Sequence, residues 1–184
     1  MPLHLHHLDA RTRQLMHDEV QYDLARGEIF LSSRLSDGGR AAYVAMLLDA
    51  IARGDVDTFA AALARGRVLN PYEQSHSRNG MPYIKAVPRD AHTMLAEGEF
   101  NRFYLRALCV RAGQDGIEHL EIYRAKVVHR PRWDSEARIG KLVAASALLA
   151  DLRAHPGVDL ALGVPNGPNS GLSARLPANS NVRR

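Results

Sequence analysis

The strongest hydrophobic pattern in the chain lies between Ala96 and Ala112 and has the period of an α-helix. Its apolar side chains recur at the spacing i, i+3, i+4, i+7, i+8, which places them on one stripe of a helix. They are Phe100, Phe103, Tyr104, Ala107 and Leu108. Glu99, Arg102 and Arg106 fall on another side of the same helix. The pattern therefore predicts a helix that packs its aromatic stripe into the core.

Three further helical patterns occupy the N-terminal part, and each lies between a polar capping residue and a glycine. They run from Asp9 to Gly27, from Ser36 or Asp37 to about Arg53, and from Asp55 to Gly66. Ser and Asp cap helix starts with their side-chain oxygens, while glycine often ends a helix. The sequence therefore predicts three helices, with the second and third forming a helical hairpin.

The periodic pattern disappears between Val68 and Val87. Together with Pro88, which follows it directly, this stretch holds three prolines, the Asn79-Gly80 dipeptide and many polar residues. Long interior loops are uncommon without a role, so an irregular connector of this length is either functional or a flexible boundary without chemistry of its own. We predict an irregular connector over 68–87.

The C-terminal half combines helical and extended patterns. Residues 89–96 continue helically after Pro88, and Gly98 either separates them from the central helix or lies within one long helix. Residues 120–128 are rich in β-branched and aromatic types and predict a strand, with 172–176 as its pairing partner. Residues 144–154 predict a helix, and 159–164 predict a further short strand.

These elements indicate an α+β fold in one domain, mainly helical, with a small antiparallel sheet in the C-terminal half. The chain has 184 residues, of which 46% are hydrophobic, which suits a single folded core. We divide it into a helical N-terminal half (1–67), the connector (68–87), a helix-plus-sheet part (88–176) and a polar tail (177–184).

The sequence gives no sign of membrane insertion or secretion. No apolar run approaches the roughly 20 residues of a membrane-spanning helix, and the N-terminus lacks the basic and apolar regions of a signal peptide. Cys109 is the only cysteine, so no disulfide forms within the chain, and its position beside the apolar stripe favours a buried thiol. We predict a cytoplasmic protein without membrane contact.

Positive charge is concentrated in the second half of the chain. The net charge is +4. Between Arg102 and Lys141 nine basic residues face five acidic ones, a difference that equals the whole net charge. A surface of this sign attracts phosphates and acidic partners, although charge alone does not choose among them.

These basic residues, with two aromatic neighbours, form the predicted ligand-binding site. Guanidinium groups suit a phosphate backbone, and aromatic planes suit stacked bases. The predicted ligand-binding residues are Arg102, Arg106, Tyr123, Arg124, Lys126, Arg130, Arg132 and Trp133. The leading hypothesis is non-catalytic binding of nucleic acid or another polyanion, such as an acidic protein. The alternative for Arg102 and Arg106 is an ordinary solvated helix face with ion pairs.

Two other functions stay open. The chain is either a protein-interaction or assembly subunit, including a homo-oligomer, or a small enzyme that acts on a phosphorylated or nucleotide substrate. In the enzyme hypothesis Glu97 or Glu99 is the base, but no motif of a known catalytic site supports it. We predict no metal site and no cofactor, and expect His4, His6 and His7 to form an exposed cluster without a function.

Overall fold

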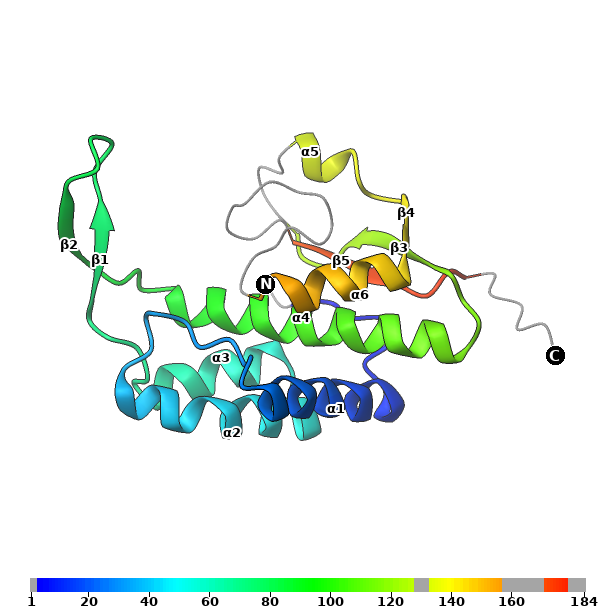
Figure 1. Cartoon of the computed structure of the whole chain (residues 1–184), viewed down its shortest axis with the longest axis horizontal. Coiled ribbons are helices and arrows are strands. Elements are labelled where there is room, and N and C mark those ends of the chain that lie inside the picture. Colours follow the sequence, from blue (N-terminus) through cyan, green and yellow to red (C-terminus); the bar gives the residue numbers. More distant parts are fainter. Residues whose placement is uncertain (1–2, 128–132, 157–170, 179–184) are drawn as a thin grey trace. The chain divides into compact units, whose positions relative to one another are not determined.

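The computed structural model describes residues 3–127, 133–156 and 171–178 (Figure 1). Its described residues form six helices and two small antiparallel sheets, of two and three strands. The α+β fold class is therefore confirmed. Two compact units make up the chain: residues 1–30 with 97–184, here called the sheet unit, and residues 31–96, here called the hairpin unit.

The elements divide between the two units as follows. The sheet unit contains α1 (Ala10–Arg26), most of α4 (Ala91–Gln114), β3 (His119–Arg124), α5 (Trp133–Glu136), β4 (Leu142–Ala144), α6 (Ala145–Ala154) and β5 (Leu172–Arg175). The hairpin unit contains α2 (Asp37–Arg53), α3 (Val56–Arg65), β1 (Tyr72–His76), β2 (Pro82–Ala86) and the first turns of α4.

The three N-terminal helices begin where the capping pattern predicts. Asp9 accepts a hydrogen bond from the Thr12 backbone, and Ser36 caps α2 in the same way. At α3, Asp55 and Thr58 cap each other reciprocally. These bonds satisfy backbone N–H groups that have no partner within the helix, which is why the sequence locates the starts so well.

Helix α4 is the centre of the sheet unit's core. It passes through Gly98 without interruption, so the long-helix alternative is the correct one. The predicted aromatic stripe is fully buried: Phe100, Phe103, Tyr104, Ala107 and Leu108 all have 0% exposure. Asn101 binds the Leu172 carbonyl and accepts a bond from Ser173, which fastens β5 to the helix.

The three-stranded sheet has the order β4-β3-β5 and is antiparallel throughout. The predicted pairing of residues 120–128 with 172–176 is confirmed, with Glu121 opposite Arg175, although β3 ends at Arg124. Strand β4 was not predicted, because three residues are too few to show an alternating pattern. The strand expected over 159–164 lies outside the described residues.

The predicted irregular connector over 68–87 is instead a two-stranded hairpin, formed by β1 and β2 (Figure 1). Its prolines lie before β1, at the first residue of β2 and after β2, where a missing N–H costs no bond within the ladder. Gly80 has a φ of 77° in the connecting turn, a conformation that glycine adopts without strain. Both strands are largely exposed, so no alternating hydrophobic pattern marks them.

No helix within the described ranges is long and apolar enough to cross a membrane.

The burial of Cys109 in α4 leads to a test of this core. Its side chain is 3% exposed, and burial raises the pKa of the thiol to about 12. Because the thiolate is the reactive form, we expect iodoacetamide at pH 8 to leave the native protein unmodified while labelling the denatured protein rapidly. Mass spectrometry over time measures this, and fast labelling of the native protein would contradict the described packing of α4.

Candidate functional site

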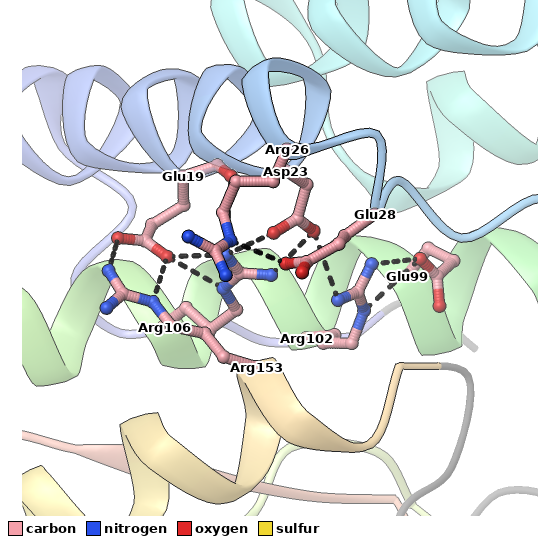
Figure 2. A network of polar contacts seen from close by, with 8 residues as sticks. All are labelled: Glu19, Asp23, Arg26, Glu28, Glu99, Arg102, Arg106 and Arg153. Carbon is pink, nitrogen blue, oxygen red and sulfur yellow. Dashed lines mark hydrogen bonds and ion pairs between the residues drawn. The ribbon is translucent and has the colours of Figure 1, made fainter.

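Arg106, a member of the predicted basic face, is completely buried. Its Nε donates to Glu19 Oε2 at 2.8 Å, and its Nη1 donates to Asp23 Oδ2 at 2.7 Å (Figure 2). Its side chain has 0% exposure, and both carboxylates come from α1. The guanidinium therefore joins α4 to α1 and has no surface to offer a ligand.

Arg102 lies one turn earlier in α4 and is also buried, at 5% exposure. Its Nη2 donates to Glu99 Oε2 at 2.7 Å, and its Nη1 lies 3.5 Å from Asp23 Oδ2. The guanidinium also stands 4.4 Å from the centre of the Phe103 ring. Arg102 is therefore held by two carboxylates and an aromatic face inside the sheet unit.

Arg153 of α6, whose side chain is 30% exposed, joins this network at its edge. Its Nη2 donates to Glu19 Oε1 at 2.5 Å, and its guanidinium lies 4.2 Å from the centre of the Tyr22 ring. The network thus holds three arginines and three carboxylates, whose formal charges cancel. Its members are Glu19, Asp23, Glu99, Arg102, Arg106 and Arg153. It links α1, α4 and α6 and removes two of the predicted ligand residues from the surface. Figure 2 also draws the exposed Arg26–Glu28 pair beside the network.

The two glutamates considered as catalytic bases are both engaged in ion pairs. Glu97 pairs with Lys126, and Glu99 pairs with Arg102. Burial raises the pKa of Glu99, while the Arg102 guanidinium opposes this shift. A carboxylate that is buried and already bonded is poorly placed to take a proton from a substrate. Catalysis by either residue stays a prediction.

The remaining predicted ligand residues differ in burial and in their partners. Arg124 pairs with Glu136 at 2.5 Å, and Tyr123 is 7% exposed and donates to the His4 carbonyl. Trp133 is 80% exposed at the start of α5. Arg130 and Arg132 lie outside the described residues. Polyanion binding by these residues stays a prediction, without Arg102 and Arg106 as surface contacts.

The hairpin presents apolar side chains to solvent. Ile84 is 76% exposed, Met81 68%, Tyr72 64% and Tyr83 47%. Residues that are paired across the strands share a face, so Tyr72 and Ile84 lie on one face of the hairpin and Tyr83 on the other. Exposed apolar side chains that share a face mark interaction surfaces in soluble proteins, and Tyr72 and Ile84 are diagonal neighbours on one face.

The hairpin's backbone hydrogen bonds determine which groups point outward. The Val87 N–H donates to the Pro71 carbonyl at 3.0 Å, and the Ser77 N–H donates to the Met81 carbonyl at 2.9 Å. Hydrogen-bonded pairs alternate with non-bonded pairs in an antiparallel ladder, so the intervening bonded pairs are at the odd-numbered residues. The even-numbered residues of β2, including Ile84 and Ala86, therefore direct their backbone groups away from β1.

The two outer edges of the hairpin differ. Beside the start of β1, the Asn70 N–H donates to the Arg34 carbonyl at 2.8 Å, and the Arg34 side chain donates to Glu73 at 2.6 Å. The segment around Arg34 thus lies beside the chain just before β1. Among the described residues, no hydrogen bond is made to the outward backbone groups of Ile84 or Ala86. The outward groups of Tyr72, Gln74 and His76 in β1 likewise have no bond among the described residues, so the two edges differ in the segment that lies beside the start of β1.

A hollow of about 430 Å³ lies on the hairpin between these exposed side chains. It is lined by Tyr72, Glu73, Gln74, Pro82, Tyr83 and Ile84. The sequence did carry one signal for this site: Asn-Gly between two extended runs is a strong hairpin pattern. The hairpin, with its open edge and apolar face, is the candidate functional site.

The buried network gives a stability prediction. Replacing Arg106 with alanine leaves the network with three carboxylates and only two guanidinium groups, so one buried negative charge loses its compensation and we expect the free energy of unfolding to fall by about 3 to 5 kcal/mol. The matched control is Arg53→Ala, because Arg53 pairs with Asp49 but is 79% exposed, and we expect it to have little effect. Urea unfolding of both variants measures the difference. Equal losses would contradict the assignment of Arg106 to a buried network.

The anchoring of the hairpin gives a pH prediction. The Arg34 hydrogen bond holds the pKa of Glu73 below its ordinary value, with Lys85 contributing in the same direction. Stability from a carboxylate with a lowered pKa is present above its unfolded pKa and is lost as pH falls through the folded pKa. Amide protection factors in β1 and β2 should therefore decrease as pH falls below about 4.5, the ordinary value for glutamate.

Glu73→Gln is the control for this pH effect, because glutamine does not titrate. The variant should have low protection in the hairpin at both pH 7 and pH 4. A hairpin whose protection in the wild-type protein is the same at both pH values would show that the Arg34–Glu73 pair does not hold it.

Comparisons with known proteins give no information about the function of this site. The chain matches no protein-family model, no curated protein and no solved structure.

Proposed function

We propose that this chain is a protein-interaction module, and that the open β2 edge of the hairpin is its contact surface. The single observation that carries the proposal is the position of the Ile84 and Ala86 backbone groups. They face outward, have no partner among the described residues, and stand beside apolar side chains that are also exposed. An extended strand of another protein satisfies both kinds of group at once.

An open edge of this kind is a liability that folded proteins normally suppress. Lysine and proline on an edge strand are two common protections, and β2 contains both, at Lys85 and Pro82. The protection is partial, since Lys85 lies 3.4 Å from Glu73 and its charge is offset. Pro82 removes a donor only at the first residue of the strand. The centre of the edge, at Ile84, keeps its full pairing capacity.

The interaction proposal has more support than polyanion binding. The latter requires free positive side chains, yet Arg102 and Arg106 are buried and Arg124 and Lys126 each contact a glutamate. Surface ion pairs of this kind lower the local positive field. The hairpin, by contrast, needs no rearrangement to receive a strand.

Site-specific photo-crosslinking tests the proposal in the cells that naturally produce the chain. A benzophenone amino acid at position 84 should give discrete protein adducts. Adding Ala86→Pro should abolish them, because proline removes the outward N–H at the edge while leaving the exposed face in place. The matched control position is Asp57, which is exposed on α3 in the same unit and should give no discrete adduct.

The effect of Ala86→Pro on the adducts shows whether the β2 edge makes the contact. Adducts at position 84 that persist unchanged with Ala86→Pro would show that the exposed side chains, and not the strand edge, make the contact. An absence of discrete adducts at position 84 would remove the proposal.

A further inference from the structure

We propose that the partner of the β2 edge is a second copy of this chain, paired antiparallel through Ile84 on a two-fold axis. The result is a four-stranded antiparallel sheet with the order β1-β2-β2-β1. This inference rests on the proposed function and adds the identity of the partner and the register of pairing. The inference is drawn from the order of side chains along β2. This order favours one register of self-pairing and disfavours the registers shifted by one residue in either direction.

The β2 edge suits such pairing better, because among the described residues only the β1 edge has a neighbouring segment bonded beside its start. The segment around Arg34 lies beside the start of β1 on the side away from β2, through the bonds of Asn70 to Arg34 and of Ser36 to Val68. A second strand along β1 would meet that segment. Two-fold pairing of β2 with β2 joins identical surfaces, so it closes after one contact and makes a dimer instead of a fibre.

Backbone geometry limits the registers. The outward backbone groups are on even-numbered residues, so even-numbered residues of one copy must pair with even-numbered residues of the other. The symmetric registers near the middle of the strand are centred on Tyr83, Ile84 or Lys85. The side chains and the proline then discriminate among these three.

The register centred on Lys85 is opposed by charge. It sets Lys85 of one copy directly opposite Lys85 of the other, in a non-hydrogen-bonded pair where side chains are closest. Like charges directly opposite in a sheet are destabilising. The Glu73 carboxylate near each Lys85 is already shared with Arg34, so it compensates only in part.

The register centred on Tyr83 is opposed by proline. It sets Ile84 of one copy opposite Pro82 of the other. Pro82 has no N–H, so the outward carbonyl of Ile84 receives no bond at the centre of the interface. This register therefore leaves the best-placed backbone acceptor of the edge without a strand partner.

The register centred on Ile84 meets both requirements. Each Ile84 exchanges both backbone hydrogen bonds with Ile84 of the second copy, and each Ala86 N–H donates to a Pro82 carbonyl, so proline's missing donor falls at the ends. Lys85 then lies opposite Tyr83 of the second copy, where its ammonium can contact the ring face. The Lys85 charge therefore disfavours the Lys85-centred register and favours the Ile84-centred one.

Pairing in this register also joins the exposed apolar faces. Ile84 of both copies meets at the centre of one sheet face, with Tyr72 of each copy on the same face further out. The contact is made by one short strand from each copy, which is small for a stable protein–protein interface. The dimer is therefore expected to be weak, and covalent trapping is the suitable test.

Disulfide trapping in the purified full-length protein reads the register directly. Met81→Cys and Val87→Cys lie opposite each other in the Ile84-centred register, as a non-hydrogen-bonded pair with Cα atoms about 4.5 Å apart, within disulfide range. A mixture of the two variants should give at least about tenfold more disulfide dimer than either variant alone, because only the mixture places two cysteines in reach. Lys85, Ile84 and Tyr83 stay unchanged in this test.

The competing registers have their own reporters. Tyr83→Cys alone forms a dimer only in the Tyr83-centred register. A mixed disulfide between Tyr83→Cys and Val87→Cys forms only in the Lys85-centred register. The wild-type protein is the control for Cys109, which is buried. Adding Ala86→Pro to both members of the Met81→Cys and Val87→Cys mixture should remove the dimer, since it deletes the bond to Pro82.

The outcomes separate the two proposals. Dimer from the Met81→Cys and Val87→Cys mixture, lost with Ala86→Pro, supports self-pairing through Ile84. Dimer from a competing reporter instead overturns the register, and no dimer from any mixture overturns self-pairing. In that last case, edge-dependent adducts from position 84 to a different protein would leave the interaction function standing, whereas their absence would remove it too.

Discussion

The sheet unit depends on the pairing of α4 arginines with carboxylates that come from α1. Transferring charged groups out of water is costly, and that cost is offset only when partners and hydrogen bonds are in place. Arg106 donates three hydrogen bonds to the Glu19 and Asp23 side chains and a further one to the Glu19 carbonyl, and its side chain is not exposed at all. The relative position of α1 and α4 is thereby fixed, and Arg153 adds α6 to the same arrangement.

This network changes the meaning of the chain's basic composition. The excess of positive residues after Arg102 suggests a charged surface, but a guanidinium that is neutralised inside the fold contributes little to the external field. Arg102 and Arg106 serve the packing of the sheet unit. The net charge of +4 is therefore evidence for an anionic ligand only to the extent that the individual basic side chains are exposed and unpaired.

The edge of β2 presents the opposite situation, because the outward backbone groups of Ile84 and Ala86 have no partner among the described residues. Buried polar groups in folded proteins are almost always paired. Outward backbone groups on an edge strand are different, since water or another strand can satisfy them. Ile84 and Tyr72 expose apolar side chains next to these groups. A protein strand suits the edge better than water does, because it also removes this apolar surface from water.

Local signals carried most of the fold that could be predicted from the sequence. The caps at Asp9, Ser36 and Asp55 and the aromatic stripe of α4 depend on neighbouring residues only, so periodicity and spacing reveal them. The pairing of β3 with β5 was also predicted, from two alternating segments.

The candidate site could not be predicted in the same way. A helical pattern shows that Arg102 and Arg106 share a side of α4, but not that Glu19 and Asp23 of α1, about 80 residues earlier in the chain, lie against it. The hairpin was mistaken for a connector because strands exposed on both faces show no alternation of apolar and polar residues. Its turn dipeptide, Asn79-Gly80, was the one local sign of its presence.

The central claim is that the β2 edge is open in the single chain and closed by a partner strand. Residue-resolved amide hydrogen exchange at increasing protein concentration tests it most directly. We expect the Ile84 and Ala86 amides to exchange fast in dilute protein and to gain protection as concentration rises, while the inward amides of Tyr83 and Lys85 are protected throughout. Ile84 and Ala86 amides that are already protected in dilute protein, or that stay unprotected at every concentration, would contradict the account.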